Sequence, residues 1–257
     1  MPVCLAALQH LLTTGQRQKD IEYRVKHLND SWRWHSSNAL PIRDKNDQVI
    51  GIKGNAKDIT EHKQVEDNVR QLAFYDVLTG LPNRRLLTDR LTQAMSASKR
   101  SGRFGAVMFL DLDNFKPLND QYGHGMGDLM LIEVARRLTD SVREIDTVAR
   151  LGGDEFVVLL NELDTDKTDA VSQAHGVAEK IRSILSLPYL LNVAQTDQQN
   201  ENVEHHCSAS IGLVMFANHE VSQEEIIKLA DQAMYQAKEN GRNQIRLNAD
   251  LGCKGAD

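Results

Sequence analysis

Two pairs of acidic residues stand where side chains of this type contribute little to packing. Asp111 and Asp113 end an apolar run, residues 104–112, that has the length of a buried strand. Residues at positions i and i+2 of a strand point to the same face, so both carboxylates are expected on one side of its carboxyl end. Carboxylate and phosphate oxygens are the ligands that Mg²⁺ prefers. Ordinary solvation and capping of the strand end is the alternative for this pair.

The second pair, Asp154 and Glu155, follows two glycines, Gly152 and Gly153, between two apolar runs. Glycines allow a phosphate to approach the backbone closely, although a plain hairpin turn favours the same residues. If the two acidic strands are neighbours, Asp111 and Asp154 converge, and converging carboxylates repel each other unless a cation neutralises them. Nucleotidyl transfer is one reaction that needs such metals, at the α-phosphate.

The rest of the chain supplies the elements that must position these residues. Residues 1–60 are strand-like and predict a small antiparallel meander, and residues 61–75 predict a connector helix. Its stripe of Val65, Val69 and Leu72 either pairs with a second copy or packs on its own domain. Residues 76–250 predict an α/β (α+β) domain. Its expected elements are a helix after Asn83, a strand over 104–112, a Gly/Asn/Asp-rich loop, a helix over 131–138, strands over 147–151 and 156–160, a helix over 177–184, an exposed loop over 195–204, a strand over 206–216 and a last helix from Ser222 to Gly241.

Composition excludes several classes of protein. The 257 residues are 41% hydrophobic and 26% charged, which does not fit collagen-like, disordered or disulfide-scaffold chains. The formal net charge of −6 argues against a nucleic-acid-binding surface. No apolar run approaches the roughly 18 residues of a membrane span, and no signal peptide is apparent at the start. Cys4, Cys207 and Cys253 form no disulfide framework, so we expect a cytoplasmic protein.

Five motifs in order resemble those of GGDEF-domain diguanylate cyclases. They are DVLTGLPNRR at 76–85, FLDLDNFK at 109–116, the stretch from Asn119 to Asp128, RLGGDEF at 150–156, and ADQAMYQAK with GRN at 230–243. The resemblance implies a nucleotidyl-cyclase-like central sheet flanked by helices. It also implies an enzyme that condenses two GTP into cyclic di-GMP and two pyrophosphates, with the domains of a homodimer meeting face to face. The alternative is a catalytically silent module that senses GTP or cyclic di-GMP or mediates interactions.

The resemblance assigns roles to matching positions. Asp111, Asp154 and the Leu112 carbonyl would hold Mg²⁺, with Mn²⁺ as the alternative metal, and Asp154 or Glu155 would take the hydroxyl proton. Asn119 and Asp128 would read guanine, as their hydrogen-bonding groups allow. His124 either belongs to the nucleotide loop or stabilises it. The triphosphate would be neutralised or cradled by Lys116, Lys238, Arg242 and the backbone N–H groups of a loop at Phe115. Lys238 and Arg242 equally suit the negative end of a helix dipole.

Arg143 and Asp146 resemble the RxxD inhibitory site of the same family, at which the product binds. A surface ion pair between positions i and i+3 is the alternative. Arg182 is a guess for a supporting arginine. If the resemblance holds, cyclic di-GMP is both the product and an inhibitor.

The amino-terminal segment resembles the carboxyl half of a PAS domain with its PAC extension. The matching residues are 22–25, 32–34, 41–44 and 58–61. The segment is shorter than a complete PAS domain, so we expect a truncated domain without a walled ligand pocket. Trp32 and Trp34 are expected to face a sheet surface or a partner.

Overall fold

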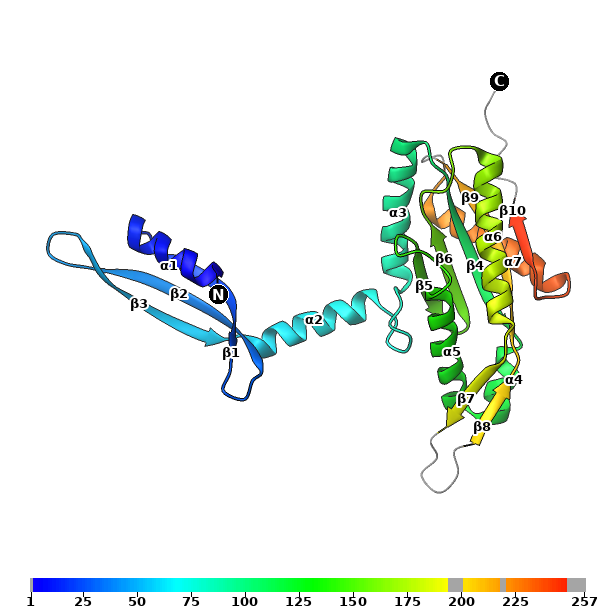
Figure 1. Ribbon diagram of the computed structural model, residues 1–257, viewed down its shortest axis with the longest axis horizontal. Helices are drawn as coiled ribbons and strands as arrows, with labels where there is room; N and C mark the ends of the chain where they lie inside the picture. Colours follow the sequence, from blue (N-terminus) through cyan, green and yellow to red (C-terminus); the bar gives the residue numbers. More distant parts are fainter. Residues whose placement is uncertain (1, 194–200, 218–220, 249–257) are drawn as a thin grey trace. The chain divides into compact units, whose positions relative to one another are not determined.

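The computed structural model describes residues 2–193, 201–217 and 221–248. The chain divides into two compact units, residues 1–71 and 72–257. Both contain helices and sheet, and the larger has a mixed central sheet flanked by helices, so the expected α/β class is confirmed (Figure 1). No helix within the described ranges is long and apolar enough to cross a membrane.

The first unit is an antiparallel sheet with one helix on its face. The strands are β1 (Gln18–Lys26), β2 (Trp32–Arg43) and β3 (Val49–Asp58), paired in that order. Helix α1 (Pro2–Thr14) covers one face, and Leu11, Ile21 and Ala39 are buried there (Figure 1). The prediction of strands throughout residues 1–60 is therefore wrong for α1. Its run of Ala, Leu and Gln residues has high helix propensity, which decides the conformation in the absence of turn residues.

Both tryptophans lie on β2 and share one cation. The Arg24 guanidinium carbon is 5.8 Å from the ring centroid of Trp32 and 5.8 Å from that of Trp34. Trp32 is exposed, as are Leu40 and Ile42 on the same strand. The tryptophans thus face a sheet surface rather than a buried pocket.

The connector is helix α2 (Thr60–Phe74), which contains no buried residue. Asp58 starts it, because its Oδ1 accepts hydrogen bonds from the Thr60 N–H and Thr60 Oγ1. The side chains of Val65, Val69 and Leu72 are all more than half exposed. The apolar stripe of α2 is therefore uncovered by the described residues of its own chain.

The second unit has a sheet with the strand order β10-β9-β4-β6-β5, in which β10 is parallel to β9 and the other neighbours are antiparallel. Strands β7 and β8 form a separate antiparallel hairpin. In chain order the elements are α3 (Arg84–Ser101), β4 (Gly105–Asp113), α4 (Phe115–Tyr122), α5 (His124–Thr139), β5 (Thr147–Gly152), β6 (Glu155–Leu160), α6 (Lys167–Leu185), β7 (Tyr189–Val193), β8 (Glu201–His205), β9 (Ser208–Phe216), α7 (Gln223–Glu239) and β10 (Ile245–Asn248).

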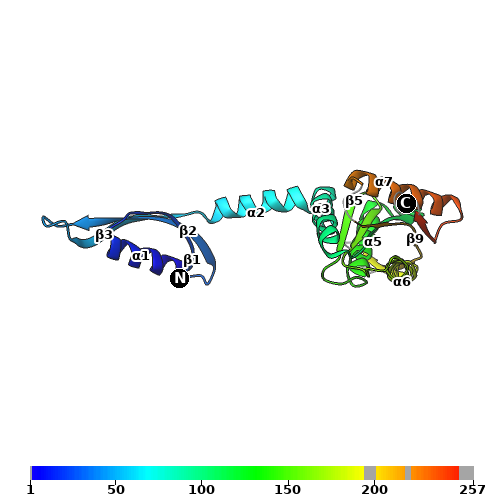
Figure 2. The same cartoon turned by 90° about the horizontal axis from the view of Figure 1, so that it is seen from above.

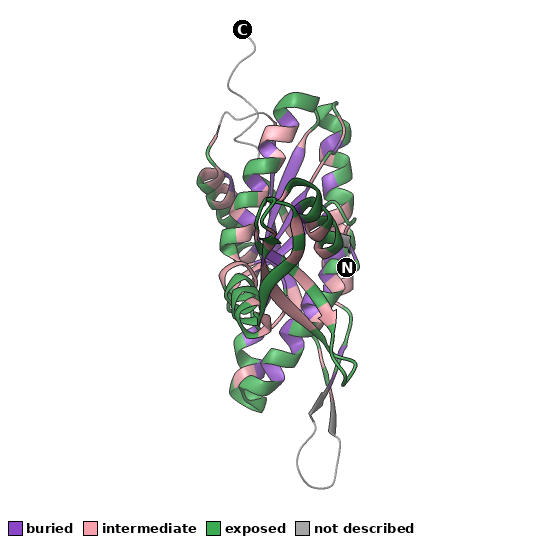
Figure 3. Ribbon diagram, turned by 90° about the vertical axis from the view of Figure 1, so that its left-hand side faces the viewer, coloured by how far each residue is buried: buried purple, intermediate pink, exposed green. Residues whose placement is uncertain are grey.

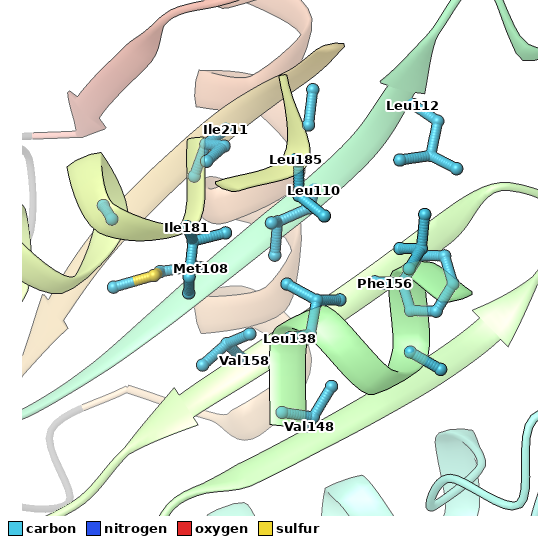
Figure 4. Packing of buried hydrophobic residues seen from close by; sticks show 14 of the residues in the cluster. Met108, Leu110, Leu112, Leu138, Val148, Phe156, Val158, Ile181, Leu185 and Ile211 are labelled. Carbon is cyan, nitrogen blue, oxygen red and sulfur yellow. The ribbon is translucent and has the colours of Figure 1, made fainter. Parts of the chain in front are cut away.

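Helices cover both faces of this sheet. The even-numbered residues of β4 pack with α5 and α6 (Figure 4). Val107 and Phe109 pack with α3 and α7 instead. Figure 2 shows α6 and α7 on opposite sides of the sheet. Every residue of β4 is buried, which explains the continuous apolar run in the sequence. Figure 3 shows the buried strands enclosed by helices whose outer faces are exposed. Because alternate residues face opposite layers, Asp111 and Asp113 share the α7 side with Val107 and Phe109.

Several expected elements are confirmed, including the helix after Asn83, the central strand and the last helix. Asn83 Oδ1 accepts hydrogen bonds from the N–H groups of Arg85 and Leu86, and Ser222 Oγ accepts one from Glu225. The prediction of a Gly/Asn/Asp-rich loop after the central strand is wrong, because α4 and the start of α5 occupy that stretch. Asn114, at φ 61, and Gly123, at φ 82, supply the left-handed breaks on either side of α4, so turn-forming residues flank a short helix.

The expected exposed loop over 195–204 is also wrong in part. Residues 201–204 belong to β8, and residues 195–200 lie outside the described residues. Strands β7 and β10 were not expected. Both are short, and such strands depend on a neighbouring strand rather than on a local pattern.

Candidate active site

The carboxyl end of β4 lies beside the hairpin turn between β5 and β6. Asp111 is directly opposite Glu155 in the antiparallel register, and the N–H of Leu112 donates to the Asp154 carbonyl over 3.4 Å. Directly opposed residues have side chains on the same face of a sheet. The strands that bear the two acidic pairs are therefore neighbours, as their convergence requires.

The outer side of this turn is open. A Cβ added to Gly152 or Gly153 would meet no atom within 4 Å. Asp154 and Glu155, which complete the turn, are both partly buried. Space for a ligand therefore lies next to a half-buried carboxylate pair.

Asp111 is a buried carboxylate with a cation beside it. It is 7% exposed, and Lys238 Nζ lies 2.7 Å from its Oδ1, which accepts no well-aligned hydrogen bond from the described residues. Burial raises the pKa of Asp111 to about 6, against the opposing effect of the Lys238 ammonium, and the Asp154 and Glu155 carboxylates add to the rise. Lys238 therefore does not fully offset the cost of a negative charge at Asp111, so a further positive charge would be favoured beside this carboxylate.

Helix α7 reaches this position because it lies unusually close to β9. A Cβ on Gly212 would stand 2.0 Å from the carbonyl oxygen of Ala230 and 2.3 Å from the Met234 nitrogen. No other residue type fits there without moving the helix. Lys238, one turn beyond Met234 on α7, is thereby brought over Asp111.

Glu155 has the second perturbed carboxyl group. Burial raises its pKa, the carboxylate of Asp231 on α7 adds to the rise, and Arg84 opposes it. A carboxylate with a raised pKa is a better proton acceptor than an ordinary one. Glu155 is therefore suited to proton transfer beside Asp111.

A hard divalent cation fits this donor set. No group of three or more His, Cys, Asp or Glu side chains among the described residues is arranged to hold a metal. The carboxylates of Asp111 and Asp154 with the Leu112 carbonyl would be oxygen ligands for such a cation, whose remaining ligands would be phosphates and water. The buried Oδ1 of Asp111, with an ammonium already at 2.7 Å, supports this fit.

Asp113 does not join that donor set. Its carboxylate is 2% exposed and accepts hydrogen bonds from Ser208 Oγ at 2.6 Å, Ser210 Oγ at 2.7 Å and the Asn243 N–H at 3.0 Å. Identical residue types at i and i+2 thus have different surroundings. The expectation that both acids of β4 serve a cation is wrong for Asp113, because internal donors already occupy it.

The two expected guanine-reading residues stand on facing helices. Asn119 lies on α4 and Asp128 on α5, and the buried Oδ1 of Asn119 accepts no hydrogen bond from the described residues. A Cβ on Gly127 would stand 2.0 Å from that oxygen, so the Asn119 side chain lies directly against the backbone of α5 there. A buried acceptor without a donor is costly, and a ligand N–H would relieve that cost. His124 is exposed at the start of α5.

The expected phosphate-binding residues are distributed over two helix ends. Phe115 begins α4 with its side chain in the core, so only its backbone faces outward, and Lys116 is exposed beside it. The expected nest at Phe115 is therefore the first turn of a helix, whose N–H groups also suit anions. Lys238 lies in the last turn of α7 and Arg242 in the turn that follows.

Arg143 and Asp146 contact each other at the start of β5. The Arg143 guanidinium donates to Asp146 Oδ1 and Oδ2 at 3.3 and 3.2 Å and to the Asn161 carbonyl at 2.8 Å. Asp146 is buried and also accepts the N–H groups of Arg143 and Asn161. The ion pair named as the alternative is thus present, and Asp146 also closes the turn.

A cavity of about 390 Å³ adjoins this pair. Its lining includes Glu144, Ile145, Asp146 and two arginines, Arg90 and Arg103. Arg182, the guess for a supporting arginine, contacts Glu179 and Asn243, and its part in product binding stays a prediction. Sequence spacing could not identify Arg90, which reaches the Thr147 hydroxyl from α3 across the fold.

Comparison with known families decides the relationship. The family described as "Diguanylate cyclase, GGDEF domain" matches residues 73–244, more than half of the chain. The chain belongs to the GGDEF diguanylate cyclase family. A PAS fold matches residues 1–56, so both expected resemblances are confirmed. Members of this family that make cyclic di-GMP use a divalent metal. This agrees with the oxygen donors of β4 and of the hairpin turn between β5 and β6, called the GGDEF turn from here on.

Curated relatives share the GGDEF region. The bifunctional diguanylate cyclase/cyclic di-GMP phosphodiesterase MucR of Pseudomonas aeruginosa is 47% identical over 173 residues, which cover 67% of this chain and 23% of MucR. The diguanylate cyclase DosC of Escherichia coli is 38% identical over 209 residues, 81% of this chain and 40% of DosC. The chain therefore spans well under half the length of either relative.

Solved GGDEF structures have the same fold. The GGDEF domain of YfiN or TpbB from Pseudomonas aeruginosa matches with a TM-score of 0.57 at 36% identity, covering 66% of this chain and 97% of that one. The coiled coil and GGDEF domain of DgcB from Caulobacter crescentus, in complex with c-di-GMP, matches with a TM-score of 0.63 at 27% identity, covering 74% and 93%.

Arg150 and Asp76 are functional candidates to which the sequence analysis gave no role. Arg150 Nε and Nη2 donate to the Gly153 carbonyl of the GGDEF turn at 3.0 and 2.8 Å, and Nη1 contacts Asp76 Oδ1 at 2.9 Å. Both residues stood inside quoted motifs, which was the available signal. Their pairing across 74 positions is visible only in the fold.

Proposed function

We propose that the protein is a diguanylate cyclase that condenses two GTP into cyclic di-GMP and two pyrophosphates. The observation that most supports this proposal is the juxtaposition of buried Asp111, cationic Lys238 and the open GGDEF turn. In the proposed reaction the 3′-oxygen of each GTP forms a bond to the α-phosphorus of the other. The bond from that phosphorus to the β-phosphate bridge oxygen breaks, and pyrophosphate leaves.

Asp111, Asp154 and the Leu112 carbonyl would hold Mg²⁺, or Mn²⁺ in its place. When bound, the cation supplies charge neutralisation at the α-phosphate and orients the attacking oxygen. Lys238, whose Nζ lies 2.7 Å from Asp111 Oδ1, would then be available to contact phosphate, because like charges beside one carboxylate repel each other.

Glu155 or Asp154 would accept the proton of the 3′-hydroxyl. The raised pKa of Glu155 favours it for this step, because a weakly acidic carboxyl group binds a proton more readily near neutral pH. Lys116 and Arg242 would neutralise the outer phosphates, and the backbone at Phe115 would donate to phosphate oxygens. These groups bind and orient the triphosphate; they are not part of the proton path.

Asn119 and Asp128 would select guanine. The unsatisfied Oδ1 of Asn119 needs an N–H donor, and the exposed carboxylate of Asp128 can accept from guanine N1–H and N2–H. Adenine has no donor at positions 1 and 2, so it would leave these acceptors unpaired. His124, exposed at the start of α5, would be part of the loop that binds the nucleotide.

Catalysis requires two copies, because each product molecule contains two nucleotides and each domain holds one GTP. A homodimer can form through the uncovered stripe of α2, whose Val65, Val69 and Leu72 follow the 4-3 spacing of a coiled-coil seam. The stripe is short, so the dimer is expected to be weak and to respond to the amino-terminal unit.

Product inhibition at Arg143 and Asp146 belongs to the same proposal. Cyclic di-GMP phosphates would compete with Asp146 for the Arg143 guanidinium, and Arg90 and Arg103 lie along the adjoining cavity. Arginine binds phosphate with two parallel hydrogen bonds, so a phosphate group can replace the Asp146 carboxylate as the partner of Arg143.

The decisive experiment is product analysis after incubation with GTP and Mg²⁺. We expect cyclic di-GMP and pyrophosphate from the full chain and no product from Asp154→Ala, whose melting temperature should match the wild type because a turn carboxylate contributes little packing. Specific activity should fall when the protein is diluted below its dimer dissociation constant. Binding of guanine nucleotide without pyrophosphate release would instead identify the alternative, a catalytically silent sensor.

A further inference from the structure

The turn between α7 and β10 has an unfavourable backbone. Gly241, Arg242 and Asn243 have φ values of 113°, 64° and 44°, so three successive residues are left-handed. Residues other than glycine adopt this conformation at a cost and keep it only when surrounding contacts impose it. Arg242, which we propose binds phosphate, is one of the two strained non-glycine residues.

Contacts at three successive residues impose the turn. The N–H of Gly241 donates to the Lys238 carbonyl at 3.4 Å and that of Arg242 to the Ala237 carbonyl at 3.0 Å, and two further sets of contacts act on Asn243. Its N–H donates to the buried Oδ2 of Asp113 at 3.0 Å. Its Oδ1 accepts from Arg182 Nη1 at 2.8 Å and from Ser186 Oγ at 3.3 Å. Asn243 is thus held from opposite sides by the end of β4 and by the end of α6.

The side chain of Arg242 makes no hydrogen bond or ion pair with the described part of the chain. Its exposed guanidinium is therefore placed by its backbone alone. That backbone is held at Arg242 by the Ala237 carbonyl and at the next residue by Asp113. A cation that is held in place before the ligand arrives loses less conformational freedom on binding.

We infer that Asp113 is a positioning residue that sets the place of the Arg242 guanidinium. Alternate acids of one strand then have separate tasks: Asp111 faces the reaction centre, and Asp113 fixes the arm that binds the outer phosphates. This inference rests on the proposed function, because it assumes that Arg242 contacts the triphosphate. The two can fail separately, as the following experiment shows.

The test compares two ligands that share guanosine but differ in phosphates: GMP and the α,β-methylene analogue of GTP, which cannot be cleaved at that bridge. Binding is measured by calorimetry in Mg²⁺ for Asp113→Ala, Arg242→Ala and the double variant. Each single change should weaken the triphosphate analogue about tenfold or more and GMP less than twofold, since hydrogen bonds to charged groups have that order of effect. The double variant should bind the analogue no more weakly than Arg242→Ala does.

Two further variants separate positioning from general packing. Asp113→Asn keeps an oxygen acceptor for the Asn243 N–H and should restore the wild-type preference for the triphosphate. Ser210→Ala removes a different donor to the same carboxylate and should leave that preference unchanged. If Asp113→Ala does not fold, Asp113→Ser replaces it, because its hydroxyl can still pair with Ser208 or Ser210 but is too short to accept the Asn243 N–H.

Several results would overturn the inference while leaving the proposed function intact. One is a wild-type affinity for the analogue in Asp113→Ala or, in its place, Asp113→Ser. Another is an equal loss for GMP and the analogue, and a third is additive losses in the double variant. Failure of the wild-type protein to bind the analogue at all would overturn the proposed function itself.

Discussion

Arg150 and Asp76 form an ion pair of 2.9 Å that joins the GGDEF turn to the turn following α2. The same guanidinium donates twice to the Gly153 carbonyl, and Asp76 Oδ1 also accepts from the Thr79 N–H and hydroxyl. One side chain thus links the residues that follow the connector helix to the GGDEF turn.

Replacing Arg150 with lysine should lower the rate of pyrophosphate release about tenfold or more, because one ammonium cannot contact both Asp76 and the Gly153 carbonyl. The free energy of unfolding should fall by about 1–2 kcal/mol, measured by urea denaturation. Arg103→Lys is the matched control, since Arg103 also donates twice to a carbonyl, that of Glu162, away from the turn. Equal rates for Arg150→Lys and wild type would contradict this role.

Gly127→Ala should raise the KM for GTP at least tenfold, because its Cβ would stand 2.0 Å from Asn119 Oδ1 and displace that side chain. Gly125→Ala is the control on the same helix, where an added Cβ meets no atom within 4 Å. Steady-state kinetics with GTP and competition by ATP measure both effects. The same KM in both alanine variants would show that Asn119 does not read the base.

Arg143→Ala should relieve product inhibition while leaving the initial rate unchanged. The backbone N–H of residue 143 and that of Asn161 still hold Asp146, so the turn should survive the substitution. Initial rates at rising cyclic di-GMP give the inhibition curve, with Arg136→Ala, an exposed arginine that has its own carboxylate partners, as the control. An inhibition curve that does not change in Arg143→Ala would exclude this site.

Protonation of Glu133 should make the domain less stable in acid than at pH 7. The Arg136 hydrogen bond, opposed by burial and aided by Arg137, lowers the pKa of Glu133 to about 2 from its usual 4.5. A depressed carboxyl pKa stabilises the folded state above the unfolded value, and the contribution is lost as pH falls from about 4.5 to 2. At pH 7 Glu133→Gln should lower the free energy of unfolding by about 1–2 kcal/mol, after allowance for partial exposure.

Urea denaturation at several pH values measures this difference. The difference in free energy of unfolding between wild type and Glu133→Gln should vanish as the pH approaches 2. Glu162→Gln is the control, because Glu162 is exposed and forms no ion pair with the described residues, and it should show no such difference at any pH. A gap that stays constant between pH 7 and pH 3 would show that Glu133 acts through packing rather than charge.

The local pattern of the sequence predicted most of the larger domain because its signals are short-range. The apolar run of β4 indicated a strand buried on both faces, and Asn83 and Ser222 marked helix starts through hydrogen bonds to residues two or three positions away. The same kind of signal failed at α4, where left-handed Asn114 and Gly123 bracket a helix that reads as a loop. The local pattern also failed at α1, because a short apolar run is compatible with either a helix or a strand.

By itself the sequence determined which residue types were available: two acidic pairs, a glycine turn, and basic residues at helix ends. The tertiary structure decided their tasks. Asp111 and Asp113 have the same side chain and face the same layer, yet one lies beside Lys238 and the other accepts hydrogen bonds from Ser208, Ser210 and Asn243. Those partners come from β9 and from beyond α7, about a hundred or more positions along the chain, and burial makes each contact decisive because water no longer competes for the carboxylate.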